Sequence, residues 1–128
     1  MINLYEMRKE KEPEPKYIKL YFDHLQEFQN IQFNPVLKAI LKRTTNASEG
    51  QVIYTNGKVK QEIAEECHVK LNWVQAEIGR FTKKRILIKL ANATYLLNPY
   101  LFGNGLWNDV KNIRCDENYF SNSDEKTK

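Results

Sequence analysis

The middle of the chain carries two hydrophobic periods, one after the other. Apolar residues recur every three or four positions over residues 59–67 and again over 71–84, which is the spacing of an amphipathic helix. Two short runs rich in leucine and isoleucine follow at 86–90 and 94–97, separated by a small turn. This order predicts a helix, a tight turn, a second helix and a β-hairpin.

His68-Val69-Lys70 separates the two predicted helices. Ala64 is small enough to let the second helix cross the first closely. A helix-turn-helix usually has glycine directly after the position of Cys67, since the backbone there needs a positive φ. Histidine tolerates that conformation better than most residues. The pattern predicts buried side chains at four positions: Ile63, Cys67, Val69 and Val74.

Further elements are predicted on both sides of this unit. Tyr17–Phe22 is a β-branched and aromatic run of strand length. Asn34-Pro35 is a typical helix start, and the apolar stripe that follows predicts a helix ending near Thr44 or Thr45. Residues 51–54 are a predicted short strand, followed by an Asn56-Gly57 turn signal. A last helix is predicted over 106–113.

The fold class that these elements predict is α+β, a mainly helical winged helix-turn-helix with a small antiparallel sheet or wing. Residues 1–16 contain two prolines among charges and are predicted to form a flexible arm. Residues 17–114 are the predicted winged-helix domain. Residues 115–128 are polar and charged, and we expect a disordered tail.

Charge sharpens this picture through its location. The chain has 128 residues and a formal net charge of +4. Six lysines and arginines lie between Lys70 and Lys89, against Glu77 as the single acid. Positive charge gathered on one segment favours a polyanionic partner.

The second predicted helix has an outward face that suits double-stranded DNA. Asparagine and glutamine can bond adenine bidentately, arginine can bond guanine, and an α-helix fits the major groove. Gly79 and Ala76 would let the backbone approach the bases. Lysines and arginines flanking the helix are expected to contact phosphates, and Lys89 the backbone or the minor groove. The predicted DNA-binding residues are Lys70, Asn72, Trp73, Gln75, Ala76, Arg80, Lys83, Lys84, Arg85 and Lys89.

Two plainer interpretations compete with DNA binding. A basic helix face can be merely solvated, and winged folds also serve as protein-interaction adaptors. The clustered charge and the amide side chains favour DNA over an adaptor role. Trp73 is more typical of a packing residue at the rim than of a base contact.

Catalytic and metal chemistry is not expected. His24 and His68 are the only histidines and are far apart, so the histidine pair of a DNA-nicking enzyme is missing. The sequence contains no glycine-rich phosphate loop. Cys67 and Cys115 fit neither a disulfide framework nor a zinc site. We therefore predict a cytoplasmic protein without cofactor or metal and without membrane association.

One long string supports a more specific interpretation. Residues 95–110, YLLNPYLFGNGLWNDV, together with 59–90, resemble the RepL plasmid replication protein family of Firmicutes, whose members pair a winged helix with an "NPYLFGKG-x-W-x-D-I" segment. Tyr17–Tyr21 also resembles the first strand of that family, so the resemblance covers about residues 17–114. Asn104 stands where the family often has lysine.

The resemblance implies an initiator of plasmid or mobile-element replication that binds an origin and acts in copy control. Host replication proteins would then be further partners. A transcriptional regulator of a plasmid or prophage would use the same binding surface and is the alternative. Winged-helix proteins often dimerise to read paired half-sites, so a homodimer stays open beside a monomer. For the NPYLFG residues themselves, a structural role is favoured, with the aromatic and leucine side chains packing the wing onto the body.

Overall fold

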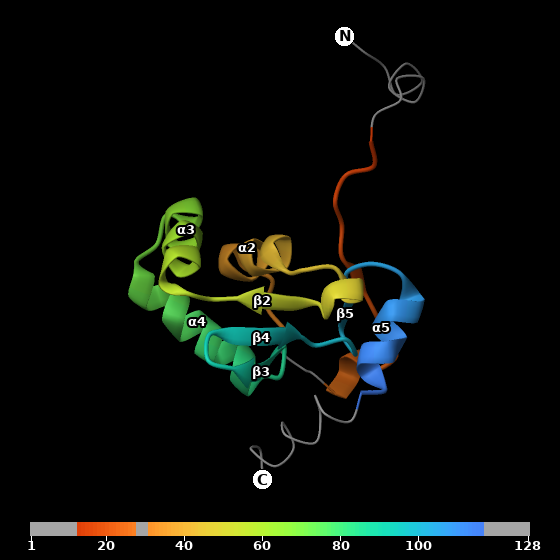
Figure 1. Ribbon diagram of the computed structural model, residues 1–128. Coiled ribbons are helices and arrows are strands. Elements are labelled where there is room, and N and C mark those ends of the chain that lie inside the picture. Colours follow the sequence, from red (N-terminus) through yellow and green to blue (C-terminus); the bar gives the residue numbers. More distant parts are fainter. Residues whose placement is uncertain (1–12, 28–30, 117–128) are drawn as a thin grey trace.

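The computed structural model describes residues 13–27 and 31–116, and these form an α+β fold (Figure 1). The predicted α+β class with small antiparallel sheets is therefore confirmed, and the arrangement is compatible with a winged helix. Most of the predicted arm and tail lies outside the described residues. The α-helices are α2 (Pro35–Arg43), α3 (Gly57–Cys67), α4 (Leu71–Lys83) and α5 (Trp107–Arg114). The strands are β1 (Lys19–Leu20), β2 (Val52–Tyr54), β3 (Leu87–Ala91), β4 (Thr94–Leu97) and β5 (Phe102–Gly103), and two 3-10 turns are η1 (Leu25–Glu27) and η2 (Ala47–Glu49).

The larger sheet is antiparallel and has the strand order β2-β4-β3. β4 lies in the centre, with Leu96 paired to Val52 on one side and to Ile88 on the other. Successive side chains of a strand point to opposite faces, so the neighbours Leu96 and Leu97 enter different parts of the core. Both are fully buried.

The main hydrophobic core lies between the sheet and helices α2, α3 and α4 (Figure 1). Ile63 and Val74 are buried in it, as predicted, and so are Ile78 and Phe81, which follow at helical spacing. Cys67 and Val69 were expected to be buried and are only partly so, because they lie at the exposed end of α3 and in the turn after it. Leu97 of the central strand belongs to this cluster.

A second, smaller cluster lies on the other side of β4, beneath α5. It contains Leu96 and Ile88 from the sheet, and Val110 and Ile113 from the helix. The last helix is therefore anchored to the same strand as the helix-turn-helix, from the opposite face.

The Asn56-Gly57 signal does not form a separate turn ahead of the helix. Asn56 is instead the N-cap of α3, and its side-chain oxygen accepts a hydrogen bond of 2.9 Å from the backbone nitrogen of Val59. Asparagine serves tight turns and helix caps through the same short polar side chain, and no strand follows here to make a hairpin. The helix consequently begins at Gly57 rather than Val59.

The strand predicted over Tyr17–Phe22 shrinks to two residues. Its partner β5 offers only Phe102 and Gly103, which pair with Leu20 and Lys19. A side chain at Gly103 would overlap the hydroxyl and ring of Tyr21, so only glycine fits at this crossing.

Gln51 joins three parts of the fold through one buried amide. Its Nε2 donates to the carbonyl oxygens of Leu97 and Phe102, each at 2.9 Å, and its Oε1 accepts from the backbone nitrogen of Asn104 at 2.9 Å. The side chain is fully buried, and the backbone adopts a φ of 54°. The ends of β4 and β5 and the segment leading to α5 therefore share one clamp.

Arg114, the last residue of α5, joins this helix to other parts of the chain. Its guanidinium lies within about 5 Å of the ring centroids of Tyr21, Tyr100 and Trp107. It also donates to the carbonyl of Pro99 at 2.8 Å and pairs with Asp23 at 2.7 Å. A guanidinium that is only 10% exposed gains from such rings because water no longer screens it. This pairing also holds the pKa of the Asp23 carboxyl below its usual value.

We expect Gln51→Ala to lower the free energy of unfolding by about 3–5 kcal/mol, because two buried backbone groups and one part-buried group would lose their partner. Urea denaturation followed by circular dichroism measures this. Gln61→Ala on the exposed side of α3 is the control and should change stability by less than about 0.5 kcal/mol. Equal effects of the two substitutions would contradict the clamp.

Candidate nucleic-acid interface

The outward face of α4 is open to solvent along its whole length. Val74, Ile78 and Phe81 turn inward and are buried, which leaves the opposite side free. Trp73, the largest side chain there, is 49% exposed. The exposed residues of this face are Asn72, Trp73, Gln75, Ala76, Gly79, Arg80 and Lys83.

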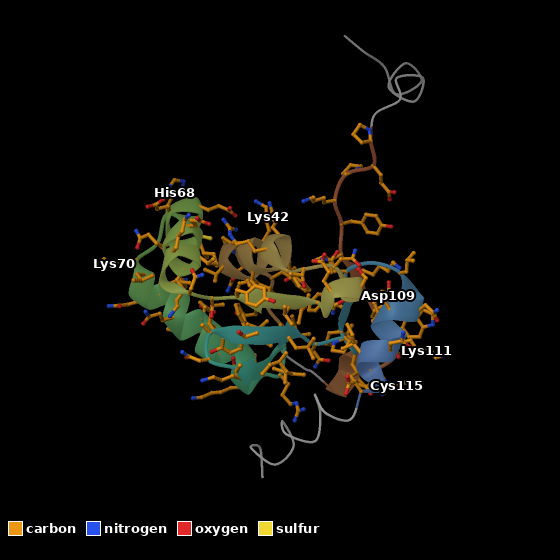
Figure 2. All side chains as sticks on the ribbon, in the orientation of Figure 1. Lys42, His68, Lys70, Asp109, Lys111 and Cys115 are labelled. Atoms are coloured by element: carbon orange, nitrogen blue, oxygen red, sulfur yellow. The ribbon has the colours of Figure 1, made fainter. Side chains whose placement is uncertain are left out.

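The turn between α3 and α4 has the backbone geometry that the sequence required. His68 has φ 56° and ψ 44°, and its N–H donates to the carbonyls of Ala64 and Glu65. The N–H of Val69 also donates to Ala64, at 3.0 Å. Histidine therefore performs the C-capping that glycine usually performs. Figure 2 shows His68 and Lys70 together at one end of the molecule.

The N-terminus of α4 is positively charged. Lys70 is the N-cap residue, it is exposed, and its side chain makes no capping hydrogen bond. The first turn of the helix contains no acidic residue. The partial positive charge of the helix N-terminus therefore adds to the charge of the lysine.

At the other end of α4, the chain enters β3 through a left-handed residue, Arg85, with φ 62°. The side-chain amide of Asn98 donates to the Arg85 carbonyl at 2.7 Å, and its oxygen accepts from the nitrogen of Tyr100. The beginning of the NPYLFG string thus holds the exit of α4. Lys84 and Arg85 are half-buried, so they are less open than the sequence predicted, whereas Lys89 on β3 is exposed.

Glu77 is the feature of α4 that the sequence interpretation missed. It was counted only as the single acid among the cations, but its side chain is 2% exposed and pairs with Arg80 at 3.2 Å. The helical spacing contained the signal, because position 77 is three residues after Val74 and four before Phe81. A carboxylate was not expected on that inward side.

The rest of the NPYLFG string is structural, as favoured from the sequence. Pro99, Leu101 and Phe102 are buried, and Tyr100 is half-buried beside Arg114. Asn104 donates to the carbonyls of Thr44 and Thr45, each at 3.0 Å, which secures the end of α2. These amide bonds could not be predicted from the sequence, because they join residues about 60 positions apart.

A second basic region lies on α2, away from α4. A hollow of about 720 Å³ between residues 14–18 and α2 is lined in part by Lys16, Lys38 and Lys42. Lys42 already pairs with Glu66 at 3.1 Å, as does Arg43, and these bonds lower the pKa of the Glu66 carboxyl. The hollow therefore has less available positive charge than its lysines suggest.

The two thiols differ in environment. Burial raises the pKa of the Cys67 thiol, the opposite of what a reactive cysteine needs. Cys115 is exposed at the end of α5. Among residues 13–27 and 31–116, no group of three or more histidine, cysteine or acidic side chains is placed to hold a metal ion. Nor does any helix in this part combine the length and apolar character needed to cross a membrane.

Comparison with known proteins adds no relative. No family model, curated protein or solved structure matches the chain. The resemblance to the RepL family therefore stays a prediction from the sequence.

We expect His68→Val to lower the free energy of unfolding by about 1 kcal/mol, because β-branched side chains tolerate the left-handed region poorly. Thermal and urea unfolding measure the change. Lys70→Val is the matched control two residues away, where the extended backbone accepts valine, and its effect should stay within about 0.5 kcal/mol. A harmless His68→Val would contradict the capping role.

Proposed function

We propose that the protein is a winged-helix protein that binds double-stranded DNA by inserting α4 into the major groove. The observation that carries the proposal is the chemistry of the outward face of this helix. It presents amides, an arginine and a lysine but no exposed acid, because Glu77, the single carboxylate of α4, is buried.

The shape of the unit supports the same proposal. α4 has 13 residues and is therefore about 20 Å long, which suffices to cross a groove about 12 Å wide. Lys70 at its start would contact one phosphate strand. Lys89 lies on β3, the strand that follows α4 in the chain, and would contact the backbone or the minor groove.

We further propose that the bound DNA is a replication origin, with an operator as the alternative. This step is supported by the resemblance of residues 95–110 to the RepL family. An origin and an operator would be bound by the same surface, so its geometry does not distinguish them. Deletion of the gene from its replicon distinguishes the two. An initiator predicts loss of plasmid maintenance, whereas a regulator predicts maintenance with altered transcription.

Lys70→Ala tests the DNA contact directly. We expect weaker binding to every duplex and a reduction of about 1 in the slope of log K against log salt concentration, because one phosphate contact is lost. Fluorescence anisotropy with labelled duplexes at several salt concentrations measures this slope.

Lys111→Ala is the matched control. It also removes one exposed lysine, but from α5 at the opposite end of the molecule (Figure 2). Its slope should equal that of the unaltered protein. Equal slopes for both variants would contradict contact through α4, and a protein whose DNA binding is absent or insensitive to salt would favour the adaptor role.

A further inference from the structure

The pair Glu77–Arg80 is an unusual use of charge on a surface helix. The two side chains are three residues apart, one nearly fully buried and the other half-exposed, with Oε1 and Nη1 at 3.2 Å. The second carboxylate oxygen, Oε2, is buried and has no hydrogen-bond partner among the described residues. Burial of an incompletely paired carboxylate opposes folding, so stability does not explain why a glutamate occupies this position.

The geometry of the pair restricts the position of the Arg80 side chain. Because the Glu77 carboxylate is held within the core, its ion pair with Nη1 restricts where the guanidinium of Arg80 lies. Arginine has five N–H donors in a rigid planar fork, and the described residues offer Arg80 no other ion-pair partner. The Arg80 side chain is 50% exposed, so part of this fork is open to solvent.

Charge balance leads to the same assignment. The buried carboxylate offsets the charge of Arg80, so this arginine adds little to general attraction for phosphates. A planar donor pair held in a fixed orientation suits a guanine, whose O6 and N7 accept bidentately in the major groove. Lys83, one turn further along, has no such partner among the described residues and remains a flexible point charge.

We infer that Glu77 is a positioning residue that orients Arg80 to read a guanine in the DNA target. The inference rests on the proposed function. Arg80 touches the base, whereas Glu77 acts through Arg80 and touches no DNA.

The test begins with selection of the preferred duplex from a randomised pool by the unaltered protein. Each guanine of that duplex is then replaced in turn, and the ratio of the two affinities is measured for each replacement. This ratio does not depend on the folded fraction, because both affinities are reduced equally by unfolding. It therefore separates positioning from stability.

We expect Glu77→Gln to reduce the ratio at one guanine by about five- to tenfold, a large part of what one bidentate contact provides. Arg80→Gln should reduce the ratio at the same guanine, and the double variant should show no further loss. Lys83→Ala should weaken binding to all duplexes alike. An unchanged ratio for Glu77→Gln, or an equal further loss in the Arg80→Gln background, would overturn the inference.

A second measurement needs no variant to fold. Nitrogen NMR of the free, unaltered protein should show restricted rotation of the Arg80 guanidinium, and a freely rotating group would overturn the inference. If the unaltered protein selected no duplex, both the proposed function and this inference would fail. DNA binding with normal salt dependence but without the guanine effect would refute only the role of Glu77.

Discussion

The fully buried amide of Gln51 is the interaction on which the arrangement of the elements depends. One side chain satisfies backbone groups at the end of β4, at β5 and at the start of the segment that leads to α5. Two of these groups, the carbonyls of Leu97 and Phe102, are buried, and loss of the partner of a buried group costs more than an ordinary hydrogen bond contributes. The hairpin, the small second sheet and the last helix therefore take their relative positions from the same residue.

The central strand extends this arrangement to the candidate interface. Leu97 packs beneath the helix-turn-helix, and its neighbour Leu96 packs beneath α5. Asn98, directly after them, holds the exit of α4 through the Arg85 carbonyl. The helix proposed to enter the groove is thus supported from inside by apolar packing and at its end by an amide. Its outer face is free to carry polar chemistry because the inner face alone fixes its position.

Local patterns in the sequence predicted most of the helices and strands. The two helices around His68, the hairpin and the inward positions Ile63, Val74 and Phe81 follow from period and burial, which act within a few residues. The sequence could not reveal Gln51, Asn104 or Arg114 as anchors, because their partners are distant in the chain and any of them could equally have been a surface residue. Asn56 was assigned to a turn because a helix cap and a tight turn use the same side chain. Glu77 was missed because charge was counted along the chain rather than by the side of the helix on which it lies. Exposure of the α4 face agrees with the prediction, whereas its role in DNA binding remains a proposal.

The two cysteine thiols differ in exposure, and this has a practical consequence. Cys115 is exposed beside α5, while Cys67 is partly covered and its thiol is harder to ionise. A maleimide dye added at neutral pH would therefore favour Cys115. Figure 2 shows Cys115 at the end opposite Lys70. The natural sequence thus already carries a labelling handle away from the α4 surface, suited to single-molecule observation without an added tag.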